Sequence, residues 1–97
     1  MKLETARGTV GVEETGSGLP VVLLHGFPHD RTLWAAQLAA APDGARLIAL
    51  DLPGFGESDS AEVPSLDHWA DWVAAALDAL AIERAVIGGL SMGGYLA

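Results

Sequence analysis

Residues 85–97 read A-V-I-G-G-L-S-M-G-G-Y-L-A, and no other stretch constrains the architecture of the chain as strongly. The stretch opens with an apolar run and then places Ser91 two residues after Gly89 and two before Gly93, in the pattern G-x-S-x-G. A serine on a tight turn between a strand and a helix has strained backbone dihedrals, and glycine on both sides removes side chains that would collide there. The pattern therefore predicts a strand, a sharp turn at Ser91 and a following helix.

Such a turn has a chemical purpose. It holds the Ser91 hydroxyl clear of the sheet and aims the first amides of the following helix at a negative charge that forms beside it. A glycine-rich linker between two elements is the alternative interpretation of the same letters. Context favours the turn, because a strand-like run precedes the motif and residues 94–97 can continue as a helix.

Composition excludes several classes of function. The chain has 97 residues, 13 acidic against five basic, and a formal net charge of -8, so we expect no binding to nucleic acid, whose phosphates would be repelled. Apolar residues make up 51% of the chain, but no apolar run approaches the length of a membrane span, and residues 1–4 lack the core of a signal peptide. The absence of cysteine excludes thiolate metal sites and disulfides, which makes a cytoplasmic protein the expectation.

Upstream of the serine motif, the chain alternates strand and helix patterns. Residues 2–14 alternate loosely around Gly8, which predicts a β-hairpin. Continuous apolar runs at residues 20–25 and 45–50 are typical of strands buried on both faces of a parallel sheet, and residues 85–88 predict a third such strand. Strands of parallel type alternating with helices predict an α/β fold with right-handed crossovers.

The first expected helix follows Asp30, a favourable N-cap residue, and ends at the Pro-Asp-Gly of residues 42–44. The second runs from Leu66 to about Ala81, with Ser65 as its cap. Its apolar stripe consists of Leu66, Trp69, Ala70, Val73, Leu77 and Leu80.

Helical spacing also assigns the tryptophans. It predicts that Trp34 and Trp69 are core residues and that Trp72, which lies off the main stripe, is a partly exposed flank.

A second informative segment is His25-Gly26-Phe27-Pro28, directly after the first buried strand. Ligands of open parallel sheets gather outside the carboxyl ends of the strands, so the loops after the three parallel-type strands should open on one edge near Ser91. Gly26 would let the backbone approach a ligand closely. The amides of Phe27 and Met92 can then point at one place, as an oxyanion hole requires.

Other chemistry is not expected. His25 and His29 have the spacing of a metal pair, but Gly26 and Pro28 exclude a helix there and no third ligand stands near, so we expect no metal site. His25 is instead expected to be a hydrogen-bonded structural residue, and His68 a solvated helix residue. The Gly-Phe-Gly of residues 54–56 lacks the third glycine of a phosphate loop, which argues against a nucleotide cofactor.

Together these motifs resemble the α/β-hydrolase superfamily, and the resemblance extends over nearly the whole chain. It rests on H-G-F-P at residues 25–28, D-L-P-G-F-G-E-S at 51–58 and G-L-S-M-G-G at 89–94, which occur in the family's order. The resemblance is closest to small esterases, enol-lactonases and cofactor-free haloperoxidase-like members. It implies the α/β-hydrolase fold, no cofactor, and a small ester-like substrate.

Carried over by position, the resemblance makes Ser91 the nucleophile of the family's nucleophile elbow, with Gly89 and Gly93 as the elbow glycines. It makes the backbone amides of Phe27 and Met92 the oxyanion hole. Serine rather than aspartate at position 91 makes the resemblance to dehalogenases and epoxide hydrolases poorer. Nothing in the sequence identifies the substrate-binding residues or the natural substrate.

The chain departs from the family in one respect. In the family the acid and the histidine of the triad follow the serine, whereas this chain continues for only six residues past Ser91 and its three histidines all precede it. We therefore expect the N-terminal part of an α/β-hydrolase domain, truncated after the nucleophile elbow.

Two further hypotheses compete with a serine hydrolase: a non-catalytic protein that binds small ligands on this fold, and an inactive truncated fragment. The isolated chain is expected to self-associate through the edge of its last strand, at residues 85–88, because that strand is central in the family's sheet.

Overall fold

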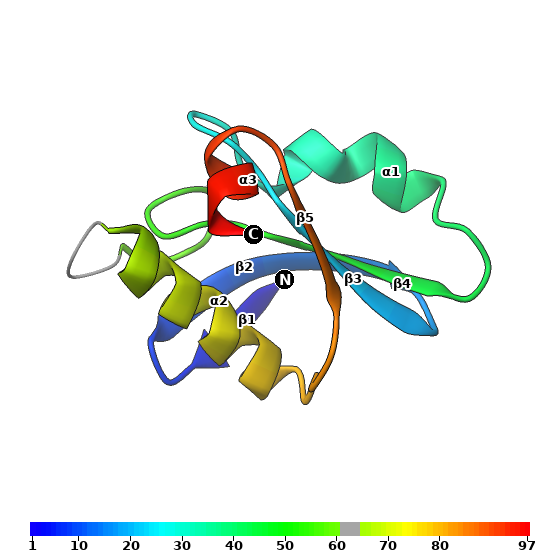
Figure 1. Ribbon diagram of the computed structural model, residues 1–97, viewed down its shortest axis with the longest axis horizontal. Helices are drawn as coiled ribbons and strands as arrows, with labels where there is room; N and C mark the ends of the chain where they lie inside the picture. Colours follow the sequence, from blue (N-terminus) through cyan, green and yellow to red (C-terminus); the bar gives the residue numbers. More distant parts are fainter. Residues whose placement is uncertain (61–64) are drawn as a thin grey trace.

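The computed structural model describes residues 1–60 and 65–97, in which strands and helices alternate much as the sequence predicts (Figure 1). In chain order the elements are β1 (Lys2–Thr5), β2 (Gly8–Gly16), β3 (Leu19–Leu24), the 3₁₀ helix η1 (Arg31–Trp34), α1 (Ala35–Ala39), β4 (Ala45–Leu50), α2 (Leu66–Ala79), β5 (Val86–Gly89) and α3 (Met92–Leu96).

The strands form one mixed sheet in the order β1-β2-β4-β3-β5. The predicted hairpin is present, since β1 and β2 pair antiparallel, and the predicted parallel strands β4, β3 and β5 are neighbours, with Leu24 opposite both Leu50 and Gly89. The antiparallel pairing of β2 with β4 was not predicted. Because the parallel strands end at the same level, the loops that follow them share one edge of the sheet.

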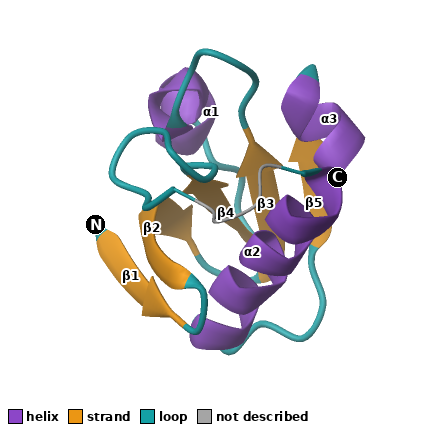
Figure 2. Cartoon of the chain, turned by 90° about the vertical axis from the view of Figure 1, so that its left-hand side faces the viewer, coloured by secondary structure: helices purple, strands orange, loops and turns teal. Residues whose placement is uncertain are grey.

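The strand order also explains the two layers of helices. The chain moves from β3 to β4 in one direction and returns from β4 past β3 to β5 in the other. Since both crossovers are expected to be right-handed, their helices belong on opposite faces. Figure 1 shows α1 and α2 on opposite sides of the strands, and Figure 2 shows α3 beside the end of β5.

The first helix differs from its prediction in form. Asp30 is its N-cap, as expected, and its carboxylate accepts a hydrogen bond of 2.9 Å from the Thr32 amide. The first turn is nevertheless a 3₁₀ helix, in which the Leu33 amide donates to the Asp30 carbonyl, and only residues 35–39 are α-helical. The start of this helix is also held from outside, because the Arg31 amide donates to Asp51.

Helix α2 begins and is capped as predicted, with the Ser65 hydroxyl accepting a hydrogen bond from the His68 amide. The assignments of Trp72 and Trp34 were wrong, because Trp72 is 3% exposed and belongs to the core, whereas Trp34 is only partly buried. Trp69 is also partly buried, and it packs against the core as predicted. The buried face is turned toward Trp72 because the β1–β2 hairpin packs against α2, and a Cβ atom at Gly8 would lie 3.3 Å from the Trp72 ring.

The core lies between the sheet and α2. Its fully buried side chains come from both layers and include Val10, Val12, Val22, Leu24, Ile48, Leu50 and Leu52 from the strands and their ends, and Val73 and Ala76 from α2. Burial of each such Val, Leu or Ile side chain contributes about 1.5–3 kcal/mol. This packing fixes the edge of the sheet where the functional loops lie. Among the described residues, no helix is both long and apolar enough to cross a bilayer.

Candidate active site

Ser91 occupies the turn between β5 and α3, as the sequence predicts. Its φ of 55° and ψ of -114° lie in a region that non-glycine residues rarely adopt, and the residue is exposed. Such a conformation costs about 1–3 kcal/mol and persists only where the surrounding structure enforces it. The strained turn presents the Ser91 side chain to solvent at the carboxyl edge of the sheet, where a substrate could reach it.

The glycines two residues before and after Ser91 permit this turn. A Cβ atom at Gly89 would lie 2.2 Å from the Gly93 carbonyl group, and one at Gly93 would lie 2.2 Å from the Leu24 carbonyl oxygen. Both contacts are with backbone, which cannot swing aside. Only glycine at both positions therefore allows the turn to fold against the end of β3.

The loop after β3 reaches the same turn. A Cβ atom at Gly26 would lie 3.0 Å from the Leu90 carbonyl oxygen and 3.3 Å from the Ser91 Cβ, and the Leu90 amide donates to the Leu24 carbonyl at 3.1 Å. Two segments more than 60 residues apart thus touch backbone to backbone. Phe27 and Met92, the predicted oxyanion-hole residues, directly follow this contact on either side. The convergence of their amides on one point stays a prediction.

His25 has the structural role expected of it. The residue is fully buried; its Nε2 accepts a hydrogen bond of 2.9 Å from the Leu52 amide and its Nδ1 lies 3.0 Å from the Gly26 carbonyl oxygen, to which it donates. Because Nε2 accepts from an amide, the ring is the neutral tautomer with the proton on Nδ1. Both ring nitrogens are therefore occupied, and His25 has none free to act as a base.

The side chains of the other two histidines, His29 and His68, form no hydrogen bond with Ser91 in the part of the chain that the structure describes. His29 is exposed, and His68 is exposed on α2 with its Nδ1 2.7 Å from the Ser65 hydroxyl. Across residues 1–60 and 65–97, no histidine is hydrogen-bonded to Ser91.

An aromatic stack joins these loops, which sequence reasoning missed. The Phe55 ring meets the His25 ring edge to face at a centroid distance of 5.3 Å, and the Phe27 ring at 5.8 Å. Phe27 itself is 71% exposed. The stack places an exposed apolar surface directly beside the Ser91 turn. The only signal in the sequence is that each phenylalanine follows a glycine in a loop after a strand.

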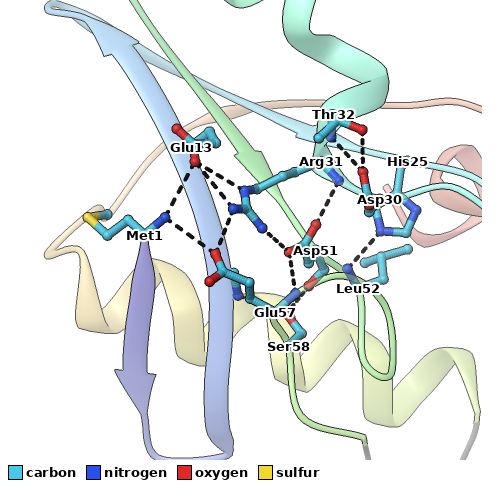
Figure 3. Close-up of polar contacts among 11 residues, drawn as sticks. Met1, Glu13, His25, Asp30, Arg31, Thr32, Asp51, Leu52, Glu57 and Ser58 are labelled. Carbon is cyan, nitrogen blue, oxygen red and sulfur yellow. Dashed lines mark hydrogen bonds and ion pairs between the residues drawn. The ribbon is translucent and has the colours of Figure 1, made fainter.

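A cluster of charged groups lies at this edge of the sheet and was not predicted from the sequence. We call it the Asp51 cluster; it consists of Met1, Glu13, Arg31, Asp51 and Glu57. Figure 3 shows the Arg31 guanidinium pointing between the carboxylates of Asp51, Glu57 and Glu13. Asp51 is fully buried, and its pairing with Arg31 compensates for the burial of its charge.

Hydrogen bonds and charge pairing shift three pKa values at this edge. Burial acts to lower the pKa of Arg31, but hydrogen bonding and charge pairing with Asp51 outweigh it and raise the pKa. Hydrogen bonds from the amino group of Met1, and then from Arg31, lower the pKa of Glu13. Hydrogen bonds from the Thr32 hydroxyl and amide lower the pKa of Asp30. All these groups stay charged at neutral pH.

The glycines of the Gly-Phe-Gly loop at residues 54–56 include one, Gly56, that is required by a close contact within the protein. A Cβ atom at Gly56 would lie 2.2 Å from the Asp51 carboxylate, so the loop wraps a carboxylate and presents no cradle for an anion. No cluster of three metal-ligating side chains exists in the part of the chain that the structure describes.

The surface near the turn is hollowed. A shallow depression of about 180 Å³ is lined by Ser65, Leu66, Trp69 and Met92, next to the Ser91 turn. The Leu66 side chain, predicted to face the core, is 47% exposed there.

Comparisons with known proteins agree with this fold. The family model described as alpha/beta hydrolase fold matches residues 20–97. AB hydrolase superfamily protein YisY of Bacillus subtilis strain 168 is 40% identical over 91 residues, which are 92% of this chain and 34% of that protein. A thermophilic esterase from Thermogutta terrifontis superposes with a TM-score of 0.87 at 44% identity, covering 99% of this chain and 38% of the esterase.

Backbone similarity does not separate the chemistries of these proteins. An epoxide hydrolase from an endophytic Streptomyces superposes with a TM-score of 0.91 at 31% identity, covering 100% of this chain and 30% of that one. Lactonases are also among the similar structures. The chain spans about a third of the length of these proteins.

Proposed function

The chain belongs to the α/β-hydrolase fold family, and from that membership we propose that Ser91 is the nucleophile of a serine hydrolase acting on a small ester-like molecule, a carboxylic ester or a lactone. The observation that carries the proposal is the left-handed backbone of Ser91 in a turn that touches Gly26. A structure keeps such strain where a hydroxyl must be presented at a fixed place. The cytoplasm is the compartment that the lack of cysteine favours.

The proposed reaction is acyl transfer. The Ser91 oxygen attacks the substrate carbonyl, a base takes the hydroxyl proton, and the carbonyl oxygen becomes an oxyanion that the amides of Phe27 and Met92 stabilise. The base passes this proton to the leaving alcohol oxygen as the bond from carbon to oxygen breaks, and water then attacks the acyl-serine, which releases the carboxylic acid and restores the serine hydroxyl. Each amide donor contributes about 2.7–4 kcal/mol to transition-state stabilisation in sites of this kind. Serine in place of aspartate at position 91 favours this chemistry over epoxide opening.

In residues 1–60 and 65–97, no histidine is placed by a hydrogen bond to accept the proton of Ser91. His25 uses both ring nitrogens in backbone hydrogen bonds, and His68 is bonded to Ser65. A serine hydroxyl without an adjacent base is a weak nucleophile at neutral pH. We therefore expect negligible turnover of short-chain nitrophenyl esters, and negligible modification of Ser91 by a fluorophosphonate, in this chain alone.

The second candidate is a non-catalytic protein that binds small ligands on the same fold, or an inactive fragment. The occupied ring nitrogens of His25 favour it, since no histidine of the described residues pairs with Ser91. The two candidates differ in the reactivity of Ser91. Selective phosphonylation requires a presented hydroxyl, oxyanion donors and a base that activates the hydroxyl, which a binding protein has no need to keep.

The test uses a longer protein that contains these residues and supplies a base for Ser91; it is labelled with a fluorophosphonate probe and its peptides are analysed by mass spectrometry. We expect modification at Ser91 in preference to the other serines, no modification there in Ser91→Ala, and an unchanged rate in the control Ser17→Ala, which alters an exposed loop serine. Equal modification of all exposed serines would overturn the nucleophile assignment. Robust ester turnover by the 97-residue chain alone would show instead that a base exists within these residues.

A further inference from the structure

Hydrogen bonds hold both ends of the loop that carries Phe27, and we call each set of these hydrogen bonds a fastening. Both fastenings involve the two adjacent residues that directly follow β4. The loop runs from His25 to Arg31, and the residues that hold it are Asp51 and Leu52. The sequence predicts that His25 is a hydrogen-bonded structural residue, but it identifies neither the partner of His25 nor that of Asp51.

The first fastening is at the start of the loop. The Leu52 amide donates to His25 Nε2 at 2.9 Å, and the same ring donates from Nδ1 to the Gly26 carbonyl oxygen. That carbonyl belongs to the peptide whose nitrogen is the Phe27 amide. Since a peptide group is planar, fixing its oxygen also fixes the direction of the Phe27 N–H. The His29 amide also donates to this carbonyl, at 2.8 Å, so the His25 ring and the His29 amide together set the orientation of the amide proposed for the oxyanion hole.

The second fastening is at the end of the loop. The Asp51 carboxylate accepts hydrogen bonds from the Arg31 amide at 2.7 Å and from the Arg31 guanidinium, so it binds both backbone and side chain of one residue (Figure 3). Its second oxygen also accepts from the Glu57 amide at 2.9 Å. Hydrogen bonds to a charged acceptor are roughly twice as strong as neutral ones. The Asp51 carboxylate therefore holds Arg31 firmly in place.

Asp51 is itself fixed by its surroundings. Its amide donates to the Gly11 carbonyl at 2.8 Å, and its carbonyl accepts from the Ser58 hydroxyl. Gly11 and Gly56 leave room for the carboxylate, because a Cβ atom at either would lie within about 2.2 Å of it. Burying an unpaired carboxylate costs several kcal/mol. An apolar residue could therefore pack against the loop at a lower cost in the free energy of folding.

We propose that Asp51 and His25 are positioning residues, which hold the loop of residues 25–31 from both ends and thereby keep the Phe27 amide directed at the space beside Ser91. This inference rests on the proposed function for its catalytic meaning. Displacement of a catalytic group by 1 Å can cost about 10²-fold in rate. Loosening either fastening therefore slows the reaction at Ser91 without touching the nucleophile.

The experiment uses Asp51→Asn and His25→Phe in the 97-residue protein. Asn keeps the shape of Asp51 but turns an NH₂ group toward the donors of Arg31 or Glu57, and Phe keeps the ring of His25 while losing both hydrogen bonds. Backbone ¹⁵N relaxation reports the order of the Phe27 amide. The fluorophosphonate labelling rate reports the reactivity of Ser91, and it is measured with the same variants in the longer protein that supplies a base. The control Arg46→Gln removes the Arg46–Glu14 ion pair on the neighbouring strands and leaves the loop contacts in place.

Both positioning variants should lower the order parameter of the Phe27 amide from about 0.85 to below about 0.6, with amides of β4 unchanged. Labelling of Ser91 should slow by about tenfold or more, and Arg46→Gln should change neither readout. An unchanged Phe27 order parameter in either folded variant overturns the proposal, whatever happens to melting temperature. If the wild-type Ser91 is never labelled, the proposed function fails while the relaxation data still decide the positioning.

A measurement on the wild type covers the case in which the variants do not fold. The proposal requires that the amides of Arg31 and Leu52 be protected from hydrogen exchange, because both are donors in the fastenings. Fast exchange at either amide overturns it.

Discussion

The Ser91 turn (residues 89–93) and the Asp51 cluster lie at the same edge of one sheet, yet they are encoded in opposite ways. The turn is built from five consecutive residues, and its geometry follows from two glycines at fixed spacing. The cluster joins residues from β2, the start of η1, the loop after β4 and the chain's first residue. Local strain leaves a pattern in the sequence, whereas long-range charge pairing does not.

The largest expected effect concerns the centre of the Asp51 cluster. Arg31→Met removes the cation from a carboxylate that is fully buried, and breaking a buried pair in this way costs about 3–5 kcal/mol in the free energy of unfolding. Urea unfolding measures the loss. The matched control is Arg46→Met, whose partner Glu14 is 34% exposed, so it should cost under about 1 kcal/mol. Equal costs for the two variants would show that the cluster is an ordinary surface network.

The turn can be tested with a pair of neighbouring glycines. Gly93→Ala places a Cβ atom against the backbone of Leu24 and should cost about 3 kcal/mol, whereas at Gly94 the nearest atom would be 3.4 Å away. Gly94→Ala should therefore be neutral or stabilising by up to about 1 kcal/mol, since alanine favours the helix. Urea unfolding of both variants measures the difference. A tolerated alanine at position 93 would mean that the turn is looser than its spacing implies.

These two regions show how far sequence reasoning extends. The hairpin, the parallel strands and the capped start of α2 follow from periodicity and capping residues, because each depends on neighbours in the chain. The burial of Trp72 instead of Trp69 does not, since it depends on the hairpin packing against α2. Asp51 was visible only as the first residue of a glycine-rich loop, and nothing nearby indicates that Arg31, 20 residues earlier, is its partner.

A smaller effect is expected at the strand that leads into the turn. In the part of the chain that the structure describes, β5 pairs only with β3, and Val86 and Ile87 are 52% and 38% exposed. An apolar strand edge of this kind invites pairing with another chain, so we expect concentration-dependent self-association in size-exclusion chromatography. Val86→Lys should shift the protein toward the monomer, and Lys2→Val, a change on the hairpin edge, should not. A wild-type monomer at all concentrations would contradict this expectation.

The smallest effect is expected at Glu13, which lies at the exposed rim of the Asp51 cluster, whereas Arg31 and Asp51 form its buried centre. The pKa of Glu13 is lowered from its ordinary value of 4.5, first by its hydrogen bond with the Met1 amino group and then by Arg31. Because the folded pKa is depressed, the pairing stabilises the fold at pH values above 4.5, and this contribution is lost as the pH falls through the lower folded value.

Glu13→Gln should therefore lower the urea midpoint slightly at pH 7, and the difference from wild type should shrink toward zero as the pH falls below 4.5. Added salt should shrink it too, because Glu13 is 52% exposed and its partners are screened at the surface. The same variant should leave the order of the Phe27 amide unchanged, since neither fastening of that loop involves Glu13. A midpoint difference that does not shrink as the pH falls below 4.5 would mean that Glu13 acts through its packing and that its contribution is not electrostatic.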